Sequence, residues 1–138
     1  MQGTRYIIQW SAQFYTAAEL TRRSYLVSLT FGNARVSDLL VRSPNGSQFT
    51  ADVKGQSTKN FWLIQPRVPD PGHFFILVFL PAQYAPPQYF IISSDELMCL
   101  REEYKQSALA RGKYRDDLGG INWSTALRYG GKWDTLPS

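Results

Sequence analysis

Cysteine and histidine are nearly missing from this sequence. Its 138 residues include one cysteine, Cys99, and one histidine, His73. One cysteine makes no intrachain disulfide, and the two residues together do not supply the four ligands of a structural zinc site. Cys99 stands between apolar residues in a helical stretch, so it is predicted to be a small buried residue. His73 follows Pro71-Gly72 and is predicted to be a plain loop residue.

Long apolar runs and nucleotide-binding motifs are also missing. The longest apolar run, residues 74–80, covers seven residues and is far too short to span a bilayer. The first ten residues, MQGTRYIIQW, have neither the apolar core nor the cleavage motif of a secretory signal. No GxGxxG or P-loop occurs, which disfavours nucleotide-driven chemistry. A cytoplasmic protein is therefore expected.

Acidic residues are scarce and unevenly distributed. The chain has 11 Asp and Glu against 15 Lys and Arg, a net charge of +4. Residues 1–72 hold eight basic and four acidic residues, whereas residues 73–138 hold seven of each. Excess positive charge in one half suits a polyanion such as DNA. The alternative is that +4 is ordinary for a small protein.

The order of predicted elements indicates an α/β fold in one domain, residues 1–138. A first helix is predicted from Ser11, as its N-cap, to about Leu29, with Gly32-Asn33 ending it. Residues 5–10 are either an edge strand or the lead-in to this helix. Three strands and a helix follow the central hairpin, and they cover Phe61–Gln65, Phe74–Leu80, Tyr89–Ile92 and about Ser94–Ala108. Together they predict a mixed β-sheet of about five strands flanked by helices.

The central hairpin, Val36 to Gln56, carries the residues of greatest chemical interest. Pro44-Asn45-Gly46 is a strong turn signal between its two strands. A three-residue loop with Gly46 left-handed places Asp38 opposite Asp52, with the two Cβ atoms roughly 5 Å apart. A two-residue loop places Asp38 on the other face, and the sequence leaves both registers open. Lys54 lies two residues beyond Asp52 and therefore shares its face of the strand.

Two carboxylates and a lysine at one strand end are what a metal-dependent phosphodiesterase requires. Carboxylate oxygens bind Mg²⁺ or Mn²⁺, and the bound metal polarises a phosphate and lowers the pKa of a water molecule. A lysine orients that water or stabilises the charge that develops on the phosphate. The competing interpretation is a surface hairpin with an ordinary cross-strand charge pair.

The stretch SDLLVRSPNGSQFTADVKGQSTKNFWLI, with a helix before it, resembles the PD-(D/E)XK nuclease superfamily, which includes restriction endonucleases and Holliday-junction resolvases. The resemblance covers about residues 11 to 92. It implies a restriction-endonuclease-like core and a Mg²⁺-dependent DNA endonuclease. It also implies that Asp38 and Asp52 bind the metal and that Lys54 assists catalysis. Gln56, on the same face as Lys54, is expected to contact the metal-bound water or a phosphate.

One position departs from the pattern of the resolvase-like members. Their metal-site Glu lies on the first helix, about eleven residues before a Gly that ends it. Here that register falls on Gln13, with Ser24 in place of the Gly. Glutamine keeps an oxygen but loses the charge, so Gln13 is a weaker metal ligand. A catalytically inactive module that binds DNA or a protein partner is the alternative function.

Further contacts are expected if DNA is the substrate. Arg22 and Arg23, in the middle of the predicted first helix, are either solvated or in contact with the phosphate backbone. Lys59, in the polar loop after the hairpin, lies beside the expected site. A homodimer is expected because cutting two strands requires two sites, and a protein partner is the expected source of sequence specificity.

Overall fold

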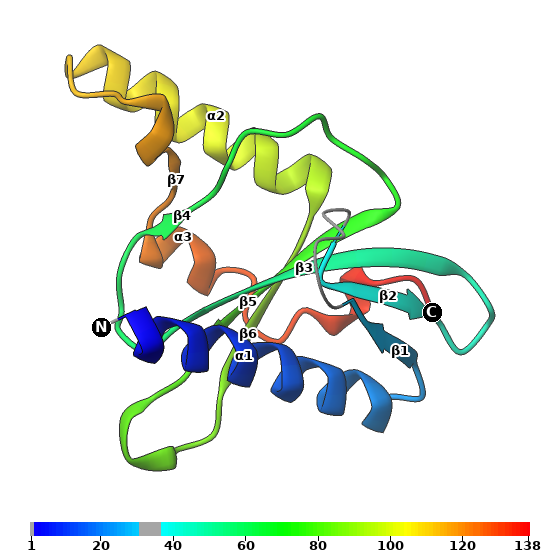
Figure 1. The fold of residues 1–138 in the computed structure, drawn as a ribbon. Coiled ribbons are helices and arrows are strands. Elements are labelled where there is room, and N and C mark those ends of the chain that lie inside the picture. The colour runs from blue at the N-terminus through cyan, green and yellow to red at the C-terminus, as the bar shows by residue number, and fades with distance from the viewer. Residues whose placement is uncertain (1, 31–36) are drawn as a thin grey trace.

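The computed structural model describes residues 2–30 and 37–138, which form the helices and strands labelled in Figure 1. In chain order they are α1 (Gln2–Arg22), β1 (Leu26–Leu29), β2 (Leu39–Arg42), β3 (Gln48–Gln56), β4 (Trp62–Leu63), β5 (His73–Phe79), β6 (Gln88–Ser93), α2 (Ser94–Ala110), β7 (Gly120–Ile121) and α3 (Trp123–Leu127). Short 3₁₀ turns lie at Ala82–Tyr84, Asp116–Leu118 and Trp133–Thr135.

The central sheet has five strands in the order β1-β2-β3-β5-β6. Strands β3 and β5 pair in parallel, and the other three pairs are antiparallel. The predicted α/β class and mixed five-stranded sheet are therefore confirmed. The parallel pair puts β3 in the middle of the sheet, where it carries Asp52 and Lys54.

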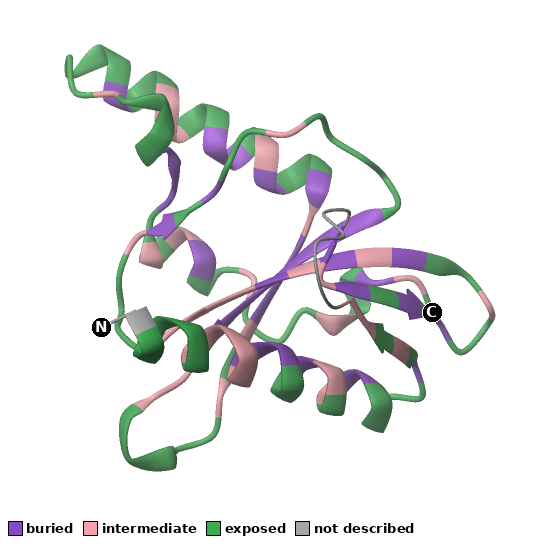
Figure 2. Cartoon of the chain, viewed as in Figure 1, coloured by how far each residue is buried: buried purple, intermediate pink, exposed green. Residues whose placement is uncertain are grey.

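A helical layer covers each face of this sheet. One core packs α1 residues Ala12 and Leu20 against alternate residues of β3 and β5. The other packs the opposite face of β5 and β6 against α2 and α3. All seven residues of β5 are buried because the strand has a core on both sides, as its continuous apolar sequence predicts. Figure 2 shows this arrangement, with buried residues along the central strands and exposed ones on the outer surfaces of the helices.

The first helix begins and ends earlier than predicted. It already includes residues 5–10, so Ser11 is not its N-cap, and it ends before Ser24 rather than at about Leu29. The predicted stop at Gly32-Asn33 lies outside the described residues. Ser24 has φ +72°, and Tyr25 N donates to Leu20 O while Ser24 N donates to Thr21 O. These contacts form a Schellman motif with serine in the left-handed position that glycine usually occupies. The chain therefore turns back at Ser24, and residues predicted as helix form β1 instead.

The predicted strand at Phe61–Gln65 exists only as the two residues of β4, and it lies outside the central sheet. It pairs with β7 in a separate two-stranded sheet. A Cβ on Gly120 of β7 would lie 1.8 Å from the carbonyl oxygen of Trp62, so this close pairing requires glycine. Strand β1 takes the fifth place in the central sheet. The apolar composition of residues 61–65 predicted a strand. Its pairing partner is β7, because Gly120 of that strand leaves room for the carbonyl oxygen of Trp62.

Helix α2 begins as predicted, with the Ser93 hydroxyl accepting from Glu96 N. The prediction that Cys99 is buried is wrong, because its side chain is exposed. The buried residues of α2 include Leu97, Leu100 and Ala108, and Cys99 falls between two of them on the solvent side. In the described residues, no helix combines the length and the apolar character needed to cross a membrane.

Candidate functional site

The turn between β2 and β3 sets the register of the candidate site. Ser43 N donates to Ser47 O at 2.7 Å, and Gly46 has φ +93°, so the loop has three residues. The ladder then pairs Leu39 with Ala51, and one further step along it places Asp38 opposite Asp52. Of the two registers that the sequence allows, the structure has the one that brings the carboxylates together.

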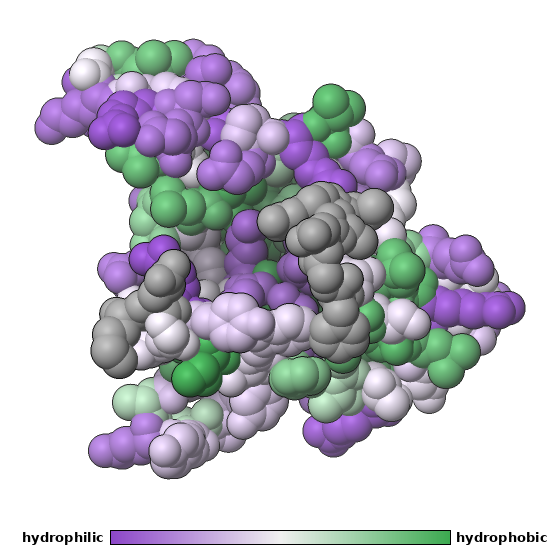
Figure 3. All heavy atoms as spheres, viewed as in Figure 1, coloured by the Kyte–Doolittle hydropathy of each residue, from purple (hydrophilic) through white to green (hydrophobic). Residues whose placement is uncertain are grey.

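Strand β3 presents its polar side chains on the face opposite α1. Ala51 and Val53 belong to the core beneath α1, and alternation along the strand turns Asp52, Lys54 and Gln56 to the other face. All three are partly exposed. In the space-filling view a hollow opens between α1 and α2, and hydrophilic side chains gather in it near the middle of β3 (Figure 3). The candidate site therefore borders solvent, as a site for a large polyanion must.

Asp38 is held at the point where β2 pairing ends. Its Oδ2 accepts the backbone N–H of Val53 at 2.8 Å. Burial raises the pKa of Asp38, the hydrogen bond from Val53 opposes that rise, and the negative charge of Asp52 adds to it. A raised pKa means that the fold disfavours the ionised form of the Asp38 carboxyl group. A cation bound beside it would stabilise that ionised form.

Asp52 has the opposite electrostatic setting. Its Oδ2 lies 3.1 Å from Arg67 Nη1 and 3.5 Å from His73 Nε2. Burial alone would raise its pKa, but contacts with His73 and the charges of Arg67 and Lys54 outweigh burial and lower the pKa. Asp52 is therefore a stable anion in the fold. Among the described residues, Arg67 is in direct contact with Asp52, whereas the contact given for Asp38 is the neutral backbone N–H of Val53.

His73 is not the loop residue that was predicted. It is the first residue of β5, is fully buried, and pairs with Thr50 of β3. Its Nδ1 lies 2.6 Å from Thr50 Oγ1, and its Nε2 lies 3.0 Å from Arg67 Nη1. Arg67 Nη1 therefore lies within hydrogen-bond distance of both the His73 ring and the Asp52 carboxylate.

Sequence reasoning missed Arg67 and His73 as members of this cluster. Arg67 lies in the connection from β4 to β5, and nothing in its local sequence marks it as a partner of Asp52. His73 directly precedes the apolar run of β5, which was the available sign that it starts a buried strand. The parallel pairing of β3 with β5 sets His73 beside Thr50, and the connection that leads into β5 brings Arg67 to Asp52; both are tertiary features.

Helix α1 completes the exposed edge of β3 beyond the end of β2. Gln9 Nε2 donates to Val53 O at 2.6 Å, and Gly55 N donates to Gln9 Oε1 at 3.1 Å. The Gln9 amide thus replaces a missing neighbouring strand. Gln13 lies one helical turn farther along the same side, 6% exposed, and its Oε1 is buried without a hydrogen-bond partner. An unpaired buried acceptor carries a free-energy cost, so this oxygen is a candidate ligand for a cation or a water molecule.

The other residues predicted for the site lie at the far end of β3 or away from it. Gln56 Nε2 donates to Asn60 O at 2.8 Å and so closes the turn that contains the exposed Lys59. Arg22 and Arg23 are not in mid-helix but at the C-terminal end of α1, and α1 packs on the other face of the sheet. Arg23 pairs with Glu19 at 2.9 Å and stacks on Trp133. The structure thus gathers Asp38, Asp52 and Lys54 but leaves Arg22 and Arg23 apart from them.

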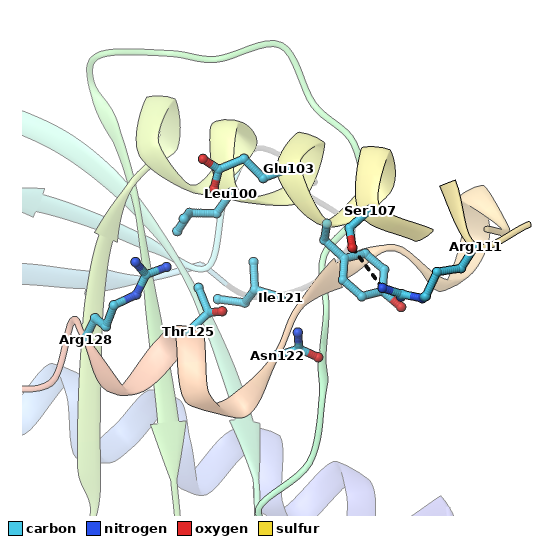
Figure 4. A pocket seen from close by; sticks show the side chains of 9 residues that line it. Leu100, Glu103, Ser107, Arg111, Ile121, Asn122, Thr125 and Arg128 are labelled. Carbon is cyan, nitrogen blue, oxygen red and sulfur yellow. Dashed lines mark hydrogen bonds between the residues drawn. The ribbon is translucent and has the colours of Figure 1, made fainter. Parts of the chain in front are cut away.

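A pocket of about 310 Å³ lies elsewhere, between α2, β7 and α3 (Figure 4). Its two arginines come from the end of α2 and from the residue after α3, and Arg111 Nη1 donates to Ser107 Oγ at 2.8 Å. Glu103 is its one acidic side chain. The pocket contains none of the residues predicted for the hairpin site, and it lacks the paired carboxylates that a metal-dependent reaction requires.

The donor set at the hairpin fits a hard cation in part. Asp38 and Asp52 each use Oδ2 in a contact given above, while neither Oδ1 forms a hydrogen bond or ion pair with a described residue. Mg²⁺ commonly binds through one or two carboxylates, with water and substrate phosphate supplying the other ligands. Across residues 2–30 and 37–138, no group of three or more His, Cys, Asp or Glu side chains is arranged to hold a metal. A cation would therefore bind weakly unless phosphate contributes.

Comparison of this chain with protein-family models, with curated proteins and with solved structures finds no match. The functional argument therefore depends on the geometry of the hairpin site.

Proposed function

We propose that this chain is a metal-dependent DNA endonuclease with a restriction-endonuclease-like core. One observation supports the proposal above the others. The β2–β3 turn brings Asp38 opposite Asp52 across the hairpin, with Lys54 on the same face as Asp52. The order of the elements is compatible with it, because a helix precedes the hairpin and β5 lies parallel to β3.

Asp38 and Asp52 would hold the cation. Gln13 has an unpaired oxygen, but it belongs to α1, which covers the face of the sheet opposite Asp52, so it would join them only at the edge of β3. When bound, a divalent cation polarises the phosphate and lowers the pKa of a water molecule. The remaining work falls to side chains of the chain. Lys54, whose charge acts on both carboxylates, orients the attacking water and stabilises charge on the phosphate. Gln56, about 13 Å farther along the strand than Asp52 and with its N–H closing the turn to Asn60, would contact a neighbouring phosphate of the DNA.

Arg67 and His73 have positioning roles in this proposal. Arg67 holds the Oδ2 of Asp52 and is one third exposed, so its outer nitrogens remain available to a phosphate oxygen. His73 fixes the Arg67 nitrogen from the buried side. Lys59, at the same end of β3 as Gln56, would contact the DNA backbone, and Arg22 and Arg23 could do so only along a separate surface.

Titration calorimetry with Mn²⁺ and then Mg²⁺ tests the site. The variants are Asp38→Asn and Asp52→Asn, and the matched control is Asp95→Asn, an exposed aspartate in the first turn of α2. We expect wild type and the control to bind the cation, alone or with duplex DNA present, and both site variants to lose binding. Cleavage of linear, junction, flap and single-stranded DNA should then be lost in Asp38→Asn and in Lys54→Ala. Unchanged cleavage in these two variants would contradict the mechanism.

A second candidate function is favoured by the Arg67–Asp52 ion pair. Because Arg67 already neutralises Asp52, the cluster also fits an inactive nuclease fold that binds DNA or a protein partner without cutting. In that case no cation binds at millimolar concentration, with or without DNA, and Asp38→Asn leaves DNA affinity unchanged. The same titrations therefore decide between the two functions.

A further inference from the structure

The pocket between α2, β7 and α3 is lined by charged side chains that have no ionic partner. Arg111, Arg128 and Glu103 line it, and among the described residues none of the three forms an ion pair. Acidic partners do occur nearby, because Arg101 on α2 and Arg115 shortly after it both pair with aspartates. Charged groups that remain unpaired around a pocket can bind the charged groups of a ligand.

Each arginine of the pocket has a hydroxyl group close to it in the chain. On α2, Arg111 Nη1 donates to Ser107 Oγ at 2.8 Å, which holds the guanidinium and leaves the Ser107 O–H free to donate. Thr125 of α3 lines the pocket three residues before Arg128. Figure 4 shows the first pair at one end of the pocket and the second pair at the other. A guanidinium beside a hydroxyl suits an oxyanion, because both groups donate hydrogen bonds to it.

The middle of the pocket, between these two pairs, is apolar. Leu100 is 7% exposed and Ile121 is 1% exposed, and both belong to the core that packs α2 and α3 against the sheet. The pocket volume of about 310 Å³ corresponds to roughly ten water molecules. This space suits a ligand of amino-acid size together with several water molecules. The arrangement favours two oxyanion groups joined by a short hydrocarbon chain.

One end of the pocket also combines opposite charges that do not touch each other. The pKa of the Tyr129 hydroxyl is raised, first by burial and then by its contact with Glu96. The positive charge of Arg128 lowers this pKa and the negative charge of Glu103 raises it, so both charges lie near the same hydroxyl. An amino acid has a carboxylate and an ammonium on one carbon atom. Such a head group complements a guanidinium and a carboxylate that lie close together but unpaired.

We propose that this pocket binds a free acidic amino acid, a small ligand with one ammonium and two carboxylate groups. Ser107 and Arg111 bind the carboxylate at the end of the ligand's side chain. Thr125 and Arg128 bind its α-carboxylate, and Glu103 binds its ammonium. All three unpaired charges of the pocket are then neutralised. A dicarboxylate without the ammonium leaves Glu103 unpaired and is repelled by it. This inference does not depend on the nuclease proposal, because the pocket shares no residue with the hairpin site.

NMR titration of the ¹⁵N-labelled chain at constant ionic strength tests the ligand class. The probes are L-glutamate, L-aspartate, glutarate, which lacks the ammonium of glutamate, and 4-aminobutyrate, which lacks its α-carboxylate. We expect one of the two amino acids to bind with a Kd on the order of 0.1–1 mM, the range for about ten non-hydrogen atoms. Glutarate and 4-aminobutyrate should bind at least about tenfold more weakly than L-glutamate. No binding of either amino acid at about 10 mM, well above this range, would overturn the proposal.

Variants at exposed positions place the ligand in this pocket without a risk to folding. Arg111→Gln and Arg128→Gln should each weaken binding of the amino acid at least about tenfold. The matched control is Lys113→Gln, which removes a positive charge from an exposed residue near the end of α2 that does not line the pocket. It should leave the affinity unchanged. Equal affinity of wild type and both arginine variants would contradict the assignment of the pocket.

A second pair of variants tests the contact with the ammonium. In Glu103→Gln the preference for L-glutamate over glutarate should disappear, because the carboxylate that attracts the ammonium and repels glutarate is gone. Glu102→Gln changes the neighbouring exposed glutamate, which does not line the pocket, and should keep the preference. If Glu103→Gln keeps the preference as well, Glu103 does not bind the ammonium and the proposed ligand class is wrong.

Discussion

Replacing Asp38 or Asp52 by asparagine should change the stability of the fold in opposite directions. Asparagine at position 38 keeps an oxygen that accepts from Val53 N, and it removes a buried negative charge that faces Asp52. Asparagine at position 52 removes the charge that holds Arg67 and leaves the Arg67 nitrogens with a weaker acceptor. Both variants lose one negative charge in the same hairpin, so each serves as the other's control for a general charge effect.

The magnitudes follow from the contacts. A hydrogen bond to a charged group contributes about 1.5–3 kcal/mol, and partial exposure of the Asp52 and Arg67 side chains screens this pair, so Asp52→Asn should cost about 1–2 kcal/mol. Asp38→Asn should be neutral or stabilise the fold by up to about 1 kcal/mol, because its hydrogen bond is preserved. Urea unfolding at pH 7 in the presence of a chelator measures both differences.

The pH dependence provides an independent check. The raised pKa of Asp38 means that the folded state prefers its protonated form, so wild type loses stability relative to Asp38→Asn as pH rises through that raised value. The lowered pKa of Asp52 means that the folded state prefers the ionised form of this carboxyl group. The stability that Asp52 contributes is complete above its ordinary pKa and is lost as pH falls through the lowered value. As the pH is lowered, the stability difference between wild type and Asp38→Asn should therefore disappear at a higher pH than the difference between wild type and Asp52→Asn.

Two results would refute this reasoning. Equal destabilisation by both variants would mean that the two carboxylates have the same environment. A larger loss for Asp38→Asn than for Asp52→Asn would mean that Asp38, and not Asp52, is the carboxylate that the fold holds in its ionised form.

Two further predictions concern the backbone. Ser24→Gly should stabilise the fold by about 0.5–1 kcal/mol, because φ +72° strains a serine but not a glycine, and thermal unfolding measures the gain. Gly55→Ala should cost about 2–3 kcal/mol in the same assay, because its Cβ would lie 2.6 Å from Ala12 Cβ and 3.1 Å from Ile8 O. A stability unchanged by Gly55→Ala would show that α1 does not pack this tightly on β3.

Local sequence predicted much of the hairpin. The signal Pro44-Asn45-Gly46 marked the turn, and strand alternation put Asp52 and Lys54 on one face. These features depend on neighbours a few residues apart, so a single sequence carries them. The first helix was harder, because the Leu residues at 26 and 29 continue an apolar pattern that suits helix and strand alike. The left-handed turn at Ser24 decided between the two, and serine is an uncommon residue for it.

By itself, the sequence determined the α/β class, the buried strand at 74–79, the capped helix after Ser93 and the position of the turn that pairs two acids. Only the tertiary structure decided which carboxylate is the stable anion, because His73 comes near Asp52 through the parallel pairing of β3 with β5 and Arg67 through the connection that leads into β5. It also decided that Gln9 closes the edge of β3. The physical reason is the range of the interactions. Turns and caps form between residues close in the chain, whereas the ionisation of a half-buried carboxyl depends on charges brought to it from distant strands.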